Sequence, residues 1–166
     1  MLIDSIVNNI TYPKAILLIS ISCLNMGWLI YFIRRILDDG WHPIKTLYYP
    51  YILYIFFVIL WVMSNAYFHT GWLVSLGEPA AIVMGKAANI FAYMGYSSAY
   101  HFSCRLASSK QDNKIKTWET TLLTITTIYV LYVNLMTGST ITGASVSAPS
   151  EFVLHFGSQT PYSFPY

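Results

Sequence analysis

The sequence predicts an all-α membrane protein: a bundle of four transmembrane helices followed by a C-terminal loop segment. Of its 166 residues, 55% are hydrophobic and only 10% are charged, with a mean hydropathy of +0.51. Soluble domains carry about 25% charged residues. Four apolar stretches are each about the 20 residues that a helix needs to cross a bilayer. We therefore expect a helical region over residues 1–136 and an external loop or lid segment over residues 137–166.

The four membrane spans are predicted from the apolar stretches and from the residues that interrupt them. The first follows Pro13, a residue suited to the first turn of a helix. The third follows Glu78 and Pro79, where an acidic side chain favours a helix N-terminus. Residues 1–13 contain no Lys or Arg and no small-residue cleavage site, so they are not a secretory signal. The expected spans are about 15–33, 51–69, 80–104 and 117–136.

The distribution of positive charge predicts the orientation of these spans. Seven of the nine Lys and Arg residues lie between Arg34 and Lys45 or between Arg105 and Lys116. Cytoplasmic loops carry the excess of Lys and Arg. We therefore expect an external N-terminus, two cytoplasmic loops and an external segment 137–166. The net charge of +2 is too small to suggest a nucleic-acid partner.

The third span carries polar side chains along one face, which is unusual for a helix in a bilayer. Their spacing of three, four or seven residues places them on one side of the helix: Lys86, Asn89, Tyr93, Ser97 and Tyr100. Such a face turns into a bundle or a wet cavity rather than toward lipid. It either joins helices to one another or holds a ligand. Small pairs four residues apart allow close helix packing: Ala81 with Gly85, Ala88 with Ala92 and Gly95 with Ala99.

The predicted topology places several of the polar residues in the outer half of the membrane. They come from the second, third and fourth spans: Asn65, His69, Lys86, Asn89 and Asn134. This set predicts a pocket that opens outward and is roofed by aromatic residues. Each member also has a structural alternative. Lys86 could reach the interface or pair with Glu78, Asn65 could cap backbone groups, and His69 could lie at the headgroup level.

The segment after Met136 changes composition. Residues 137–151 are rich in Thr, Ser, Gly and Ala and predict an exposed loop. From Phe152 to Phe156 the sequence shows the two-residue alternation that is typical of a strand, which predicts a short extended segment. That segment either lies over the outer end of the bundle or is a frayed tail.

Searches for catalytic and metal-binding patterns find none. The sequence has no phosphate-binding loop, no G-x-S-x-G, no H-E-x-x-H and no C-x-x-C. His42, His101 and His155 lack the spacing of metal ligands, and Cys23 and Cys104 are ordinary helix cysteines. We predict no enzyme activity, no metal and no cofactor.

Four blocks of sequence stand out: SNAYFHT (64–70), the run 84–106 with AYHFSCRL inside it, NLMTG (134–138) and PSEFVLHFG (149–157). In their order and spacing these blocks resemble the N-terminal membrane region of LuxN-type autoinducer sensor histidine kinases. The resemblance runs from about Tyr12 to the end. It implies a multi-pass receptor of the bacterial inner membrane that binds an acyl-homoserine lactone and signals to a cytoplasmic kinase, which feeds a quorum-sensing phosphorelay.

By matched position, the resemblance adds Phe156 and Phe164 to Asn134 as candidate ligand contacts. In that family a further membrane helix begins where this chain stops, and the kinase follows. We therefore expect a partial sensor region without kinase activity. The alternative is a non-binding helix bundle that forms homodimers or pairs with a full-length receptor. A small transporter is disfavoured, because no span is visibly broken to bind an ion.

Overall fold

The structure is a computed structural model that describes residues 13–38, 45–107, 117–136, 140–148 and 151–157. In these ranges it contains four long helices, one short helix and one β-hairpin. The long helices are α2 (Pro13–Asp38), α3 (Lys45–Phe68), α5 (Glu78–Ala107) and α6 (Thr117–Met136), the short helix is α4 (Gly71–Leu76), and the hairpin strands are β1 (Ile141–Ala148) and β2 (Glu151–Phe156).

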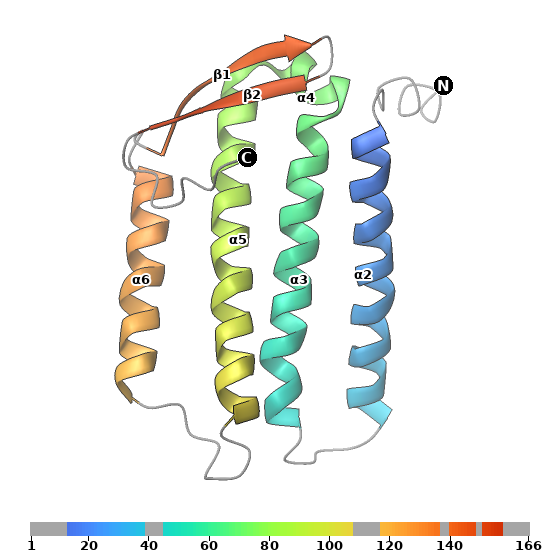
Figure 1. The fold of residues 1–166 in the computed structure, drawn as a ribbon, viewed down its shortest axis with the longest axis vertical. Coiled ribbons are helices and arrows are strands. Elements are labelled where there is room, and N and C mark those ends of the chain that lie inside the picture. The colour runs from blue at the N-terminus through green and yellow to red at the C-terminus, as the bar shows by residue number, and fades with distance from the viewer. Residues whose placement is uncertain (1–12, 39–44, 108–116, 137–139, 149–150, 158–166) are drawn as a thin grey trace.

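The long helices stand side by side in a row, in the order α2, α3, α5 and α6 (Figure 1). α2 packs on α3 through a cluster of Leu29, Ile55 and Ile59. α3 packs on α5, where the rings of Tyr51 and Phe102 lie 5.1 Å apart. The hairpin crosses one end of this row (Figure 1). We call that end, where α3 and α6 finish and α5 begins, the hairpin end.

Each expected span coincides with a long helix, although the helices are mostly longer than the spans. α2 extends beyond 15–33 at both ends, α3 begins at Lys45 rather than near residue 51, and α5 runs to Ala107. α6 has the expected bounds. Apolar length did not predict these extra turns, because the residues near the helix ends are polar. A helix outside the hydrocarbon layer needs no apolar side chains.

The connection between α3 and α5 contains a short helix, α4, which lies between the second and third expected spans. α4 is held by Leu73, which is buried in a cluster with Phe68, Ala81 and Ala144. Gly77 ends α4 with a φ of 84°, a left-handed conformation that costs glycine little. Its amide donates to the Leu73 carbonyl at 3.2 Å, which closes the last turn.

The hairpin corrects the expectation of an exposed loop over 137–151. β1 occupies most of that stretch and pairs antiparallel with β2, with Ile141 opposite Phe156 and Ala144 opposite Leu154. Ile141 is only 2% exposed. The expected extended segment at 152–156 does lie within β2. A strand that is rich in Thr, Ser, Gly and Ala was not recognisable from apolar alternation alone.

Two contacts dock the hairpin onto the first turns of α5. The Glu78 carboxylate oxygen Oε1 accepts a hydrogen bond from the Ala144 amide at 3.2 Å. Two turns further along, Gly85 faces the hairpin so closely that an added Cβ would meet Ile141 Cδ1 at 2.6 Å and Leu154 Cδ1 at 2.7 Å. Gly85 therefore provides the space in which two hairpin side chains pack on α5.

Within the described residues, two helices are long and apolar enough to cross a membrane, over Lys14–Asp38 and Tyr48–Phe68. In the most apolar 18-residue stretch of each helix, only 11% and 33% of the residues, respectively, are buried. A core helix of a soluble protein would be covered by its neighbours. Exposed apolar surface on this scale is typical of a face that contacts a membrane or another protein.

Candidate ligand-binding site

The polar face of α5 turns toward α6. The Tyr93 hydroxyl donates to Thr126 Oγ1 at 2.6 Å and lies 3.4 Å from Thr127 Oγ1. Seven residues further along, the Tyr100 hydroxyl lies 3.5 Å from a Glu119 carboxylate oxygen. At these two positions the polar face joins helices, which is the structural alternative that the sequence left open.

We predict that Tyr93→Phe weakens the attachment of α6 to α5. Hydrogen bonds between membrane helices contribute about 0.6 kcal/mol on average and up to about 1.7 kcal/mol. The short bond to Thr126 is expected near the upper figure. A double-mutant cycle with Thr126→Val, measured by reversible unfolding in micelles, isolates the coupling. Tyr129→Phe is the matched control, since Tyr129 is exposed on α6. A coupling of zero would contradict the prediction.

The register of the helices brings most candidate residues into one layer. Tyr93 bonds to Thr126 and Tyr100 to Glu119, so α5 and α6 run antiparallel. Seven residues before Tyr93 on α5, and seven residues after Thr126 on α6, Lys86 lies level with Val133 and Asn134. On the other side, Tyr51 meets Phe102 and Val58 meets Gly95. The same step of seven residues sets Asn65 level with Ala88.

The height of each candidate can be given as the α5 position that lies level with it. On that scale the candidates from α3, α5 and α6 fall between about positions 84 and 89, a range of about 8 Å at a rise of 1.5 Å per residue. They are Asn65, His69, Lys86, Asn89 and Asn134. The hairpin touches Gly85, so this polar layer lies directly beneath it. The layer is spread across three neighbouring helices rather than gathered at one point, because the helices form a row.

Asn65 and Asn134 make the same kind of side-chain hydrogen bond but differ in burial, since Asn65 is half-buried and Asn134 is buried. Asn65 donates through Nδ2 to the Trp61 carbonyl at 2.8 Å, and Asn134 donates through Nδ2 to the Val130 carbonyl at 2.9 Å. Asn134 is 2% exposed, and its Oδ1 has no hydrogen-bond partner within the described residues. A buried amide oxygen without a donor is costly. Asn134 Oδ1 is therefore a strong candidate for an acceptor that a ligand completes.

The other candidates lie at the edge of the polar layer or outside the described residues. His69 is half-buried just past the end of α3, and its backbone amide donates to the Ala66 carbonyl. Phe156 is 46% exposed on β2, beside Ile141. Phe164 lies outside the described residues.

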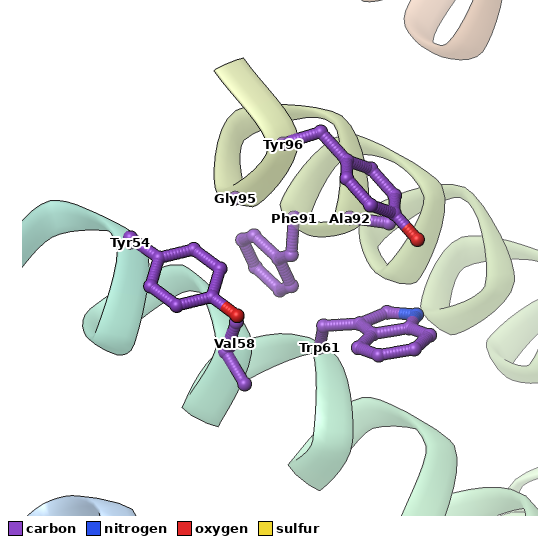
Figure 2. A pocket seen from close by; sticks show the side chains of 7 residues that line it. All are labelled: Tyr54, Val58, Trp61, Phe91, Ala92, Gly95 and Tyr96. Atoms are coloured by element: carbon purple, nitrogen blue, oxygen red, sulfur yellow. The ribbon is translucent and has the colours of Figure 1, made fainter. Parts of the chain in front are cut away.

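Sequence reasoning missed a groove between α3 and α5, about one turn below the polar layer (Figure 2). It has a volume of about 130 Å³. It is lined by Tyr54, Val58, Trp61, Phe91, Ala92, Gly95 and Tyr96. The signal for it was the aromatic stripe on α3, but the α5 wall could be assigned only after the register between the two helices was known.

The small residues of α5 are used inside the chain. Gly95 lies against Phe57 and Val58 of α3, at 3.8 and 3.9 Å from its Cβ position, and Gly85 lies against the hairpin. These positions were the reason to consider a non-binding bundle that pairs with other membrane proteins. Gly85 and Gly95 are occupied by contacts within this chain, so these two positions give that alternative no specific support.

Comparison with known proteins gives two curated relatives. Each is 36% identical to this chain over 155 residues, which is 93% of this chain. Both are called autoinducer 1 sensor kinase/phosphatase LuxN, one from Vibrio campbellii and one from Vibrio harveyi. The resemblance to LuxN-type sensors is confirmed. No family model and no solved structure matches the chain.

This chain spans 18% of the length of those LuxN proteins, so their activities as whole proteins are not transferred to it directly. The similarity to LuxN-type sensors and the two exposed apolar helices together make this chain a membrane protein. Its 166 residues contain no ATP-binding glycine motif.

Proposed function

We propose that this chain is the transmembrane sensory region of a quorum-sensing receptor and that it binds an acyl-homoserine lactone at the hairpin end. In this proposal α2, α3, α5 and α6 all cross the bacterial inner membrane. The N-terminus and the hairpin are external, because four of the six described Lys and Arg residues lie at the other end, namely Arg34, Arg35, Lys45 and Arg105. Signalling then passes to a cytoplasmic kinase that is not among these 166 residues.

The observation that carries this proposal is the buried Oδ1 of Asn134, which has no hydrogen-bond partner among the described residues, in a chain similar to autoinducer sensors. An acyl-homoserine lactone is a neutral amphiphile with an amide N–H that can donate to such an oxygen. Asn65 and Asn89 lie at nearly the same height and supply further amide groups. The hairpin covers this polar layer and shields it from water, which strengthens each hydrogen bond to a ligand.

Binding of a labelled acyl-homoserine lactone to the purified chain in lipid nanodiscs tests the proposal. We expect saturable binding to the wild type and about tenfold weaker binding to Asn65→Leu, because one hydrogen bond from the half-buried Asn65 amide contributes about 1.4 kcal/mol. Asn25→Leu is the matched control. Its Nδ2 makes the same kind of bond, to the Ile21 carbonyl at 2.9 Å, but it lies on α2, which carries none of the candidate residues.

Two results would remove the proposal for this chain. One is the absence of saturable binding by the wild type in nanodiscs. The other is an equal loss of affinity in Asn65→Leu and Asn25→Leu, since a common loss would report a general effect on helix stability.

A further inference from the structure

We propose that the groove between α3 and α5 seats the acyl chain of the ligand, with the polar head in the layer above it. This inference rests on the proposed function and extends it, because it names the part of the ligand that occupies a specific cavity. The polar candidates account only for recognition of the head. The groove supplies a separate site for the tail.

The walls of the groove are suited to a single hydrocarbon chain. Tyr54, Val58 and Trp61 form the α3 wall, and Phe91 with Tyr96 forms the aromatic part of the α5 wall (Figure 2). Between the two walls, Ala92 and Gly95 have almost no side chain, and this leaves the space. Aromatic and aliphatic walls bind apolar groups by burial and dispersion, with no requirement for a specific donor.

The size of the groove favours a short chain over a membrane lipid. Its volume is about 130 Å³. An apolar protein cavity of about 150 Å³ binds one benzene ring, so this groove holds about six carbon atoms. A phospholipid tail is several times longer and would leave most of its length outside. The acyl chain of a small lactone fits the groove in full.

Two of the three polar side-chain atoms labelled in the groove lie at one end, and the third, the Tyr54 hydroxyl, points into the groove (Figure 2). In Figure 2 the Trp61 ring nitrogen and the Tyr96 hydroxyl both point away from Tyr54, toward the hairpin end of α3. The α3 stripe of Tyr54, Val58 and Trp61 continues at the next turn with Asn65, since these residues recur at helical spacing. A chain in the groove is thus continuous with the polar layer.

The depth of this polar end also selects the head group. Trp61 and Asn65 lie within α3, about 10 and 5 Å before its end at Phe68. A charged phospholipid head is costly at that depth. A neutral amide and lactone can be held there by hydrogen bonds. Tyr96 is 57% exposed, so one wall of the groove faces the surroundings of the helix row, and a ligand can enter sideways from the bilayer.

The test compares lactones of different chain length on wild type and Ala92→Leu in nanodiscs. For the wild type, affinity is expected to rise about fourfold per methylene until the groove is full, from the free energy of burying one methylene. Leucine at position 92 fills the space. We expect the dependence on chain length to flatten, so that octanoyl lactone binds at least about tenfold more weakly while butanoyl lactone changes little. Retained butanoyl binding also shows that the variant is folded.

Ala107→Leu is the matched control, because it makes the same substitution at an exposed position of α5. A photoreactive octanoyl lactone, with its reactive group at the end of the chain, is expected to label the segments 54–61 and 91–96. The labelling should be lost in Ala92→Leu and kept in Ala107→Leu.

Three other outcomes would contradict the inference, and the measurements distinguish them from one another. If the wild type binds lactones but Ala92→Leu keeps the full chain-length dependence, the tail site is wrong and the proposed function stands. If a photoreactive phospholipid labels the same segments and excess octanoyl lactone does not displace it, the groove is a lipid site. If the wild type binds no lactone of any length, both the tail site and the proposed function fail.

Discussion

Gly85→Val is expected to displace the hairpin from α5. The Cβ of any larger residue would lie 2.6 Å from Ile141 Cδ1 and 2.7 Å from Leu154 Cδ1, and real Cβ atoms do not approach so closely. Alanine could be accommodated if these two side-chain ends moved. Valine adds two methyl groups between the same two side chains, and Ile141 is buried with no space to retreat. Overpacking of this kind costs about 1–3 kcal/mol.

The measurement is hydrogen exchange of the β1 and β2 amides in nanodiscs. A cost of 1–3 kcal/mol corresponds to about 5- to 150-fold faster exchange if the hairpin opens as one unit. Gly27→Val is the matched control, because a Cβ at Gly27 on α2 would meet no atom of another described segment within 4 Å. Unchanged exchange in Gly85→Val would show that the hairpin is not docked on α5 in the bilayer. Lactone binding should fall together with hairpin docking.

Some features of this fold follow from local sequence patterns, and others depend on tertiary contacts. The four long helices were predictable because apolar length and helical spacing are local properties. The height of Asn65, Lys86 and Asn134 was also predictable, since each residue of a helix adds a fixed rise. Their lateral placement was not. The turn of the Lys86 face toward α6 is set by Tyr93, whose partner Thr126 lies 33 residues away.

The hairpin and the groove show why the remainder could not be predicted. β1 contains only two large apolar residues, Ile141 and Val146, and what stabilises it as a strand is its pairing with β2 and its docking on Gly85 and Glu78. The groove requires Tyr54 and Trp61 to face Ala92 and Gly95, which depends on the α3–α5 register. Neither pairing leaves a trace in the local pattern of either segment.

Asn134→Leu is expected to separate stability from function. Asn134 Oδ1 is buried and has no hydrogen-bond partner within the described residues. Leucine has a similar volume and carries no polar atom. Its substitution removes an unsatisfied acceptor, which costs about 1–3 kcal/mol, and also loses the bond from Nδ2 to Val130, which contributes about 0.5–1.5 kcal/mol. The net expectation is that the ligand-free chain becomes more stable by about 1 kcal/mol.

Lactone binding is expected to change in the opposite direction, because the proposed acceptor for the ligand is gone. We expect at least about tenfold weaker binding in nanodiscs, together with a raised unfolding midpoint for the ligand-free chain. Ser22→Ala is the control, since Ser22 Oγ on α2 is also buried without a partner in the described part of the chain. It should raise stability and leave binding unchanged. If Asn134→Leu instead lowers stability and keeps full affinity, the Asn134 amide is a structural group of the fold, and the ligand must be recognised elsewhere.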